Sequence, residues 1–362
     1  MNNIYNFSAG PAMLPKKVMV QIKKDFLNWN NLGISVLELS HRNEYFFSFF
    51  KETKNNLKKL LFIPNNYEII FCHGGARGQF SAIPMNLVQK NDKSDYFCSG
   101  FWSYYAAEEA KKYCSPNIID ITQEIDEQKS LIPMQNWPIH SHSEYIHYCP
   151  NETIEGIAIF EEPQFEKNKI IIGDFSSTIL SQQINIQNYH LIYASAQKNI
   201  GIPGLTVVII NKELLKYRKN IVPSILDYNT LYMTQSMFNT PATFSWYVAG
   251  LMLEWLIESG GIKTIEKKNK KKALYLYDFI DKTDFYNNNI DKQYRSNMNI
   301  PFFIKKQNLT NLFLKKAEEN NLFGLKGHNL IGGLRASLYN AMPLKGVKKL
   351  VDFMYQFEID HR

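Results

Sequence analysis

Two charged residues, Asp174 and Lys198, follow apolar runs where a lone charge would be costly to bury. Asp174 comes directly after the β-branched run 169–173. Lys198 stands between the apolar run 191–194 and the Gly- and Pro-containing turn 201–204. Taken singly, Asp174 could cap the next turn, and Lys198 could extend its amine to solvent from the end of a strand. Taken together, they are candidates for paired chemistry.

A glycine-rich segment follows another apolar run, 68–72. Its sequence is HGGARG at 73–78, and a helical pattern begins at Gln79. Glycines let the backbone approach a ligand closely, and the free amides at a helix start favour an anion such as phosphate. The segment is neither a Walker loop nor a dinucleotide fingerprint. A tight turn between strand and helix is the alternative interpretation.

These three features are the minimal requirements of a pyridoxal-phosphate enzyme. Such an enzyme needs a lysine that forms a Schiff base and an acid that keeps the pyridine nitrogen protonated. It also needs a cradle for the phosphate. Because Asp174 and Lys198 end successive strand patterns, a parallel sheet would bring them close together. The residues therefore predict pyridoxal 5'-phosphate as the cofactor, held on Lys198.

The elements that must position these residues alternate between strand and helix. Apolar, β-branched runs occur at 68–72, 156–160, 169–173, 191–194 and 206–210, and helical patterns at 46–61 and 104–112 separate some of them. This alternation favours an α/β domain with a mainly parallel sheet covered by helices. A further helix is expected at 241–258, with Asn239 and Thr240 as caps and Ser259, Gly260 and Gly261 at its end.

Beyond residue 260 the pattern predicts a smaller C-terminal α/β domain. A helix is followed by an Asn-rich turn at 287–289, and strands are expected at 299–304 and 333–337. Helices are expected at 312–320 and from Lys345 onward. A chain of 362 residues is long enough for two such domains.

Composition narrows the class of protein. The formal net charge is +7, but only the lysines within 267–272 form a dense run, which predicts a solvated helix face. The four cysteines include no CxxC pair, and no signal peptide or apolar run of about 20 residues is apparent. We therefore expect reduced cysteines, no membrane partner and a cytoplasmic location.

Ordered segments throughout the chain resemble the phosphoserine aminotransferases, a family of class V within the fold-type I aminotransferases. The segments are NFSAGPA at 6–12, SHR at 40–42, HGGARGQF at 73–80, YCPNETI at 148–154, DFSS at 174–177, AQKN at 196–199, PSILDY at 223–228, MFNTP at 237–241 and GLRASLYNA at 333–341. No single segment is specific for this family, but so many segments in the same order are.

The resemblance implies a large cofactor-binding domain at 16–260, with a sheet of the seven-stranded type, and a small domain formed by 1–15 and 261–362. It also implies a homodimer with a shared active site. Lys198 would form the Schiff base and then act as acid and base, while Asp174 would pair with the pyridinium nitrogen. The remaining cofactor contacts would be Trp102 stacked on the ring, Thr153 on the ring oxygen, Ala76, Arg77 and Gln197 on the phosphate, and Asn239 and Thr240 from the partner subunit.

The implied reaction transfers the amino group of L-glutamate to 3-phosphohydroxypyruvate, giving O-phospho-L-serine and 2-oxoglutarate. A second implied product is 4-phosphohydroxy-L-threonine, in pyridoxine biosynthesis. Arg335 would bind the α-carboxylate. The distal carboxylate or phosphate would contact His41, Arg42, Arg77 and His328.

Two positions depart from the family pattern. Asn329 stands where an arginine often follows the histidine that matches His328, so one distal phosphate contact is either missing or supplied by a nearby lysine such as Lys326. Ala9 stands where some members carry serine. Neither change affects the cofactor chemistry.

Other readings are weaker. A cysteine desulfurase of the same class needs a reactive cysteine, but Cys72 and Cys149 lie in or beside apolar strand patterns and are expected to be structural. A nucleic-acid-binding protein would have to use the lysines of 267–272, without a known module. No metal site is expected, because His140 and His142 have no third ligand nearby.

Overall fold

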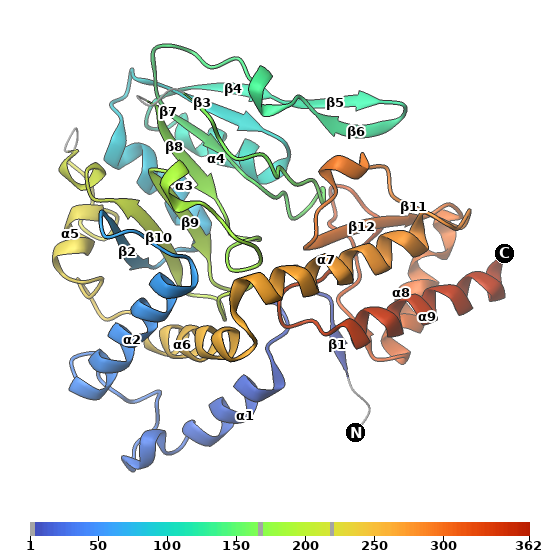
Figure 1. The fold of residues 1–362 in the computed structure, drawn as a ribbon, viewed down its shortest axis with the longest axis horizontal. Helices are drawn as coiled ribbons and strands as arrows, with labels where there is room; N and C mark the ends of the chain where they lie inside the picture. The colour runs from blue at the N-terminus through green and yellow to red at the C-terminus, as the bar shows by residue number, and fades with distance from the viewer. Residues whose placement is uncertain (1–3, 166–168, 218–220) are drawn as a thin grey trace.

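A seven-stranded sheet forms the centre of the N-terminal two-thirds of the chain (Figure 1). The computed structural model describes residues 4–165, 169–217 and 221–362. The strands, in spatial order, are β2 (Tyr67–Cys72), β10 (Thr206–Asn211), β9 (Leu191–Ser195), β8 (Ile170–Asp174), β7 (Ser143–Tyr148), β3 (Lys93–Cys98) and β4 (Ser115–Asp120). Only β10 runs antiparallel to its neighbours in this sheet. The predicted mainly parallel sheet is confirmed.

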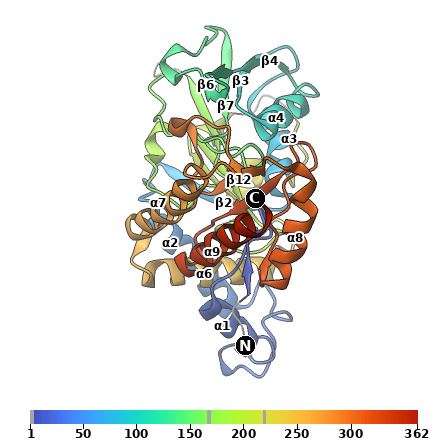
Figure 2. The same cartoon turned by 90° about the vertical axis from the view of Figure 1, so that its right-hand side faces the viewer.

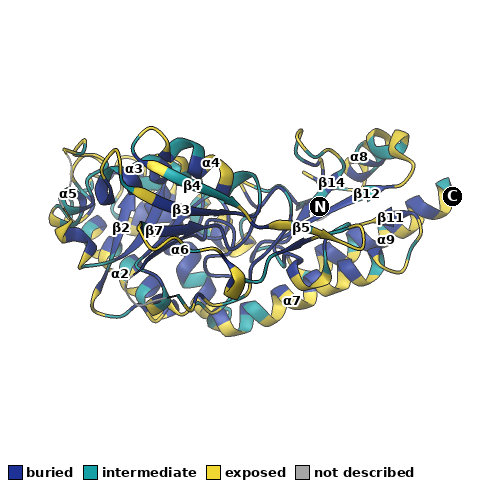
Figure 3. Ribbon diagram, turned by 90° about the horizontal axis from the view of Figure 1, so that it is seen from above, coloured by how far each residue is buried: buried dark blue, intermediate teal, exposed yellow. Residues whose placement is uncertain are grey.

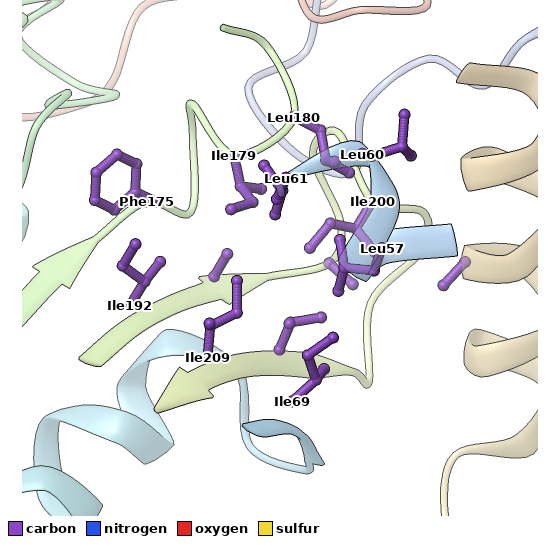
Figure 4. Packing of buried hydrophobic residues seen from close by; sticks show 14 of the residues in the cluster. Leu57, Leu60, Leu61, Ile69, Phe175, Ile179, Leu180, Ile192, Ile200 and Ile209 are labelled. Carbon is purple, nitrogen blue, oxygen red and sulfur yellow. The ribbon is translucent and has the colours of Figure 1, made fainter. Parts of the chain in front are cut away.

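Helices cover both faces of this sheet. One face packs against α3 (Gly75–Leu87) and α4 (Phe101–Ala110), and the other against α2 (Glu44–Leu60) and α6 (Thr243–Glu258). Side chains alternate along each strand, so Ile69 belongs to one apolar cluster and Ile70 to the other. Figure 4 shows Leu57 and Leu60 of α2 close to Ile69, Ile192 and Ile209 of three neighbouring strands.

The predicted strand at 156–160 is wrong. Ile157 and Ala158 form only isolated bridges, to Arg295 and Asn151. Gly156 has a φ of 73°, and a Cβ there would lie 2.2 Å from the ring of Pro301. The segment therefore passes against β12 (Asn299–Ile304) in the C-terminal part instead of joining the large sheet, and it is apolar because it is buried there.

Two predicted helices begin at other residues. α4 begins at Phe101, three residues before the pattern, and α6 begins at Thr243 rather than 241. The N-cap of α6 is Ala242, without a side-chain cap, and Asn239 and Thr240 are exposed instead of capping it. The later start follows from the backbone at Ala242, whose φ of −71° and ψ of 70° are not helical and after which the Thr243 N–H donates to the Pro241 carbonyl oxygen at 2.8 Å.

The C-terminal part forms a smaller α/β unit, as predicted. The helices α7 (Gly261–Ile280), α8 (Thr310–Glu319) and α9 (Leu344–His361) accompany the antiparallel order β11 (Tyr286–Asn287), β12, β14 (Leu334–Ser337). The N-terminal strand β1 (Tyr5–Asn6) pairs with β13 (Leu322–Phe323), so the start of the chain returns to this unit. Figure 3 shows buried inner faces and exposed outer faces on α7 and α9.

The remaining elements are peripheral. They are α1 (Lys16–Asp25), α5 (Tyr228–Met233), the hairpin of β5 (Thr122–Ile125) and β6 (Gln128–Leu131), and six short 3-10 helices at Trp29–Asn31, Met134–Asn136, Ile186–Asn188, Leu214–Lys216, Lys292–Tyr294 and Gln307–Leu309. Across the described ranges, no helix combines the length and apolar character that a membrane span requires.

The solvated face predicted for the lysine run on α7 is right for four lysines and wrong for Lys272. Lysines 267, 268, 270 and 271 are exposed, but Lys272 is 2% exposed. Its Nζ donates to the carbonyl oxygens of Leu338 and Tyr339, both at 2.9 Å. Burial, with a smaller contribution from Lys268, lowers the pKa of Lys272 from 10.5 to about 7.

We predict that Lys272 makes the stability of the fold depend on pH. Between pH 7 and 10.5 the unfolded chain binds a proton that the folded chain does not, so unfolding becomes harder as pH rises. From pH 7 to 9, the free energy of unfolding of wild type should rise by about 1–2 kcal/mol relative to Lys272→Met. Urea titrations of both proteins measure this difference. Lys271→Met, at an exposed neighbour, should track wild type. Parallel pH profiles for wild type and Lys272→Met would contradict the prediction.

Candidate active site

A cavity of about 270 Å³ opens at the carboxyl ends of β8 and β9. Asp174 ends β8, and Lys198 follows β9 by three residues, so the parallel pairing of these strands brings both side chains to the cavity. The other lining residues are Gly74, Gly75, Ala76, Arg77, Trp102, Cys149, Asn151, Thr153, Ser176, Ser177, Ser195 and Gln197. The predicted meeting of Asp174, Lys198 and the glycine segment is confirmed.

Lys198 reaches the cavity as a buried amine. Its side chain is 9% exposed, and its Nζ donates to Thr153 Oγ1 at 2.5 Å. An amine held by one hydroxyl beside an open cavity is able to react with a carbonyl compound bound there.

Asp174 is a buried carboxylate that faces the same cavity. Burial raises its pKa, while hydrogen bonding from Ser176 and the positive charge of Lys198 act in the opposite direction. The Ser176 backbone N–H donates to Oδ1 at 2.9 Å. A buried carboxylate of this kind favours a cationic or N–H-bearing ligand group opposite it.

The glycine segment forms the start of α3. Gly74 and Gly75 have φ values of 92° and 64°, a region that suits glycine. A Cβ on Gly75 would lie 3.1 Å from Ser195 Oγ, so the backbone and Ser195 are in close approach. The Ala76 N–H donates to Ser195 Oγ at 3.1 Å. Backbone amides at this helix start, together with Ser195 and Gln197, are able to hold a phosphate group.

Trp102 lines the cavity from the first turn of α4. The Arg77 guanidinium lies over the Trp102 ring at 5.6 Å and over the Tyr105 ring at 5.3 Å. Within the described part of the chain, the buried Nε1 of Trp102 has no hydrogen-bond partner. The indole therefore presents an aromatic surface and an unused donor to this region.

Two glutamates that the sequence reading did not single out hold α4 in place. Glu152 accepts hydrogen bonds from Trp102 N at 3.0 Å and from Ser103 N at 2.8 Å, and Glu155 accepts one from Phe101 N at 2.9 Å. Carboxylates at a helix N-terminus satisfy its free amides and interact favourably with its dipole. Burial and the neighbouring Glu155 raise the pKa of Glu152 to about 8. These contacts hold the first turn of α4 in place and thereby position Trp102 at the cavity.

Arg335 contacts the same residue, Thr153, as the amine of Lys198. Its Nη1 donates to the Thr153 carbonyl oxygen at 3.2 Å, while the Thr153 hydroxyl contacts Lys198. Burial lowers the pKa of Arg335, and the nearby Glu155 opposes this effect. A guanidinium at this point is positioned to bind the carboxylate of a small acid whose amino or keto group meets Lys198.

His328 lies next to this region without lining the cavity. Its ring is 5.8 Å from that of Phe101 in α4, and its Nδ1 accepts a 3.4 Å hydrogen bond from Leu330 N within its own turn. Lys326 and Asn329 flank it and are exposed.

Besides Arg335 and His328, four other predicted site residues do not line this cavity. His41 and Arg42 lie just before α2, and Asn239 and Thr240 lie just before α6. None of them lines the cavity of its own chain.

The described cysteines and histidines support neither a reactive thiol nor a metal site. Burial raises the pKa of Cys72 to about 12 and that of Cys149, which lines the cavity, well above its ordinary value. His140 Nδ1 pairs with Asp95 at 2.9 Å. No group of three potential metal ligands occurs among the residues described.

Comparisons with known proteins agree with this geometry. The family description "Aminotransferase class-V" matches residues 4–350. Phosphoserine aminotransferases of Buchnera aphidicola subsp. Cinara cedri and of Blochmanniella floridana are 57% and 54% identical over 359 and 360 residues. These alignments cover 99% of this chain and of each relative.

Solved structures give the same result. A phosphoserine aminotransferase from Bacillus circulans subsp. alkalophilus matches with a TM-score of 0.94 at 35% identity, over 99% of both chains. The PLP-bound phosphoserine aminotransferase from Trichomonas vaginalis matches with a TM-score of 0.91 at 36% identity, over 98% of this chain and all of that one. The chain belongs to the class-V aminotransferases.

Proposed function

We propose that this protein transfers the amino group of L-glutamate to 3-phosphohydroxypyruvate with pyridoxal 5'-phosphate as cofactor, yielding O-phospho-L-serine and 2-oxoglutarate. The observation that carries this proposal is the convergence of Lys198, Asp174 and the glycine start of α3 on one cavity. Relatives named phosphoserine aminotransferase align over almost the entire chain. A cysteine desulfurase is disfavoured because burial raises the thiol pKa values of Cys72 and Cys149.

The cavity has the donor set that the cofactor requires. Lys198 would hold the aldehyde carbon, Asp174 the ring nitrogen, Thr153 the ring oxygen and Trp102 the ring face. Ala76, Arg77 and Gln197 would hold the phosphate, with Ser195 beside them. When bound, pyridoxal phosphate supplies an aldehyde that takes up an amino group and a ring that withdraws electrons.

Lys198 would also carry the proton. With its amine beside the Thr153 hydroxyl, Lys198 would be placed to move a proton to or from the substrate Cα. The carboxylate of the substrate would be held by Arg335, whose Thr153 contact keeps it near that amine. The two groups would therefore orient the Cα–H bond.

The distal phosphate or carboxylate of the substrate would contact Arg77 and His328 from the same chain, and His41 and Arg42 from a partner. Lys326 would compensate for Asn329 in the loop around His328. By the same contacts, the enzyme would also form 4-phosphohydroxy-L-threonine. The proposed substrates are small and anionic, and the formal net charge of +7 favours their approach.

A homodimer with a shared active site is part of this proposal. Large apolar side chains are exposed along the stretch that leads to His41 and Arg42, and α1 projects from the body of the molecule (Figure 2). These exposed apolar residues are Met19, Val20, Phe26, Leu27, Ile34 and Leu37. A similar group precedes Asn239 and Thr240, namely Ile225, Met233 and Phe238. Exposed apolar surface of this extent is typical of a subunit interface.

The proposed division into domains places residues 16–260 in the large domain, and 1–15 with 261–362 in the small one. An apolar cluster that draws Tyr5 and Phe7 together with residues from 273 to 357 supports this division. Residues 1–3 lie outside the described residues.

Lys198→Ala should abolish both halves of the reaction. The substitution removes the group that holds the cofactor and the group that moves the proton, so turnover should fall by at least about a thousandfold. Single-turnover assays with glutamate and, separately, with phosphoserine measure each half. Substantial residual rate in either half would refute the role of Lys198.

Arg335→Lys should weaken substrate binding without displacing the cofactor. Lysine keeps the charge but loses the planar pair of donors, so KM for glutamate should rise about tenfold or more. The cofactor dissociation constant, measured in parallel, should change less than about twofold. An unchanged KM would show that Arg335 does not bind the carboxylate.

Mixing two defective chains should restore activity if the site is shared. Lys198→Ala and Arg42→Ala homodimers should both be impaired, but a mixed dimer would contain one site with both native residues. After equal amounts are unfolded and refolded together, activity should reach about a quarter of wild type, since half of the dimers are mixed and each has one intact site. Activity no higher than the mean of the two parents would place Arg42 at the site of its own chain.

A further inference from the structure

Building on the proposed function, we propose that Tyr193 and His147 form a hydrogen-bonded pair that positions the Asp174 carboxylate and keeps it ionised against the cofactor ring. Neither residue lines the cavity. Both act through Asp174, so they are positioning residues.

The three side chains lie on one face of the large sheet. Asp174 of β8 pairs in register with Tyr193 of β9, and His147 lies on β7, on the other side of β8. His147 Nε2 is 2.8 Å from the Tyr193 hydroxyl, and Tyr193 is the direct cross-strand neighbour of Asp174, where its hydroxyl acts to lower the pKa of that carboxyl. The exposed fractions are 4% for Asp174, 0% for Tyr193 and 2% for His147, so water does not replace these contacts.

The direction of the hydrogen bonds follows from the histidine. Burial lowers the pKa of His147 to about 3, so the ring is neutral and carries one N–H. Its Nδ1 is buried and has no partner within the described ranges. A proton on Nδ1 would leave an N–H unpaired, and the Tyr193 hydroxyl would then donate to Nε2 and face Asp174 with lone pairs only.

With the proton on Nε2, every hydrogen has an acceptor. His147 donates to the Tyr193 oxygen, and the Tyr193 O–H donates to Asp174. The carboxylate then receives this bond in addition to the one from Ser176 N. Donors to a carboxylate favour its charged form and so oppose the effect of burial at Asp174.

The neighbouring tyrosines provide a matched control. Tyr145 is also fully buried on this face of the sheet, and its hydroxyl is 2.5 Å from that of Tyr96. Tyr96 packs its ring on His147 at 4.8 Å between centroids, but its hydroxyl is directed to Tyr145. Tyr145→Phe therefore removes a buried hydroxyl without changing the donors to Asp174.

The test compares two ligands: pyridoxal phosphate, and its analogue with carbon in place of the ring nitrogen. Only the first can interact with Asp174 through that nitrogen. Tyr193→Phe should weaken binding of pyridoxal phosphate about tenfold, as expected for one charge-assisted hydrogen bond, and that of the analogue less than about twofold. His147→Leu should follow Tyr193→Phe, whereas His147→Gln, which retains an N–H donor, should stay within about threefold of wild type. Tyr145→Phe should leave the ratio of the two dissociation constants unchanged.

Equal losses for both ligands in Tyr193→Phe would overturn the inference, because a purely structural defect does not depend on the ring nitrogen. An unchanged ratio in His147→Leu would exclude histidine from the pair. Failure of the wild-type protein to bind pyridoxal phosphate would instead refute the proposed function. The two failures are therefore distinguishable.

Discussion

The structure depends on a carboxylate and an amine that are buried close to one another at the ends of two adjacent parallel strands. Asp174 and Lys198 are buried, so water stabilises their charges only weakly. The surrounding groups and a ligand must therefore balance these charges. The parallel pairing of β8 and β9 brings them to one edge of the sheet, and the start of α3 adds free amides there. An anionic ligand with a protonated ring nitrogen and a carbonyl group complements all three. This constraint explains why the chemistry is located at the carboxyl end of the sheet.

A single loop, 151–156, coordinates the parts of the site. Glu152 and Glu155 cap the helix that carries Trp102, and Thr153 contacts both Lys198 and Arg335. Asn151 donates to Ser177 and Asn299, which connects the loop to the C-terminal strands. Because Arg335 belongs to β14 and Lys198 follows β9, this loop sets the distance between the group that would bind the substrate carboxylate and the amine that would move the proton. A shift of the C-terminal unit would therefore change the position of Arg335 relative to the Lys198 amine.

Sequence patterns predicted the parts whose signal is local. The apolar runs of β2, β8, β9 and β10 and the polar residues that follow them were enough to predict a mainly parallel sheet and to place Asp174 and Lys198 at the same edge of it. The strands β3, β4 and β7 were missed because their segments include polar residues such as Asp95, Asn117 and His147. Ile157 and Lys272 were misjudged because their burial comes from packing between distant segments. The capping glutamates left no local pattern, since α4 lies about 50 residues away in the chain. The roles proposed for Arg42 and Asn239 would depend on a second chain, which no local pattern in the sequence reveals.

The central claim is that one amine, that of Lys198, holds the cofactor. The most direct measurement is reduction of the protein–pyridoxal phosphate complex with borohydride, followed by proteolysis and mass spectrometry of the labelled peptide. The account predicts one pyridoxyl group per chain, on the peptide that contains Lys198. Label on any other lysine, or no label in a protein that binds the cofactor, would contradict it.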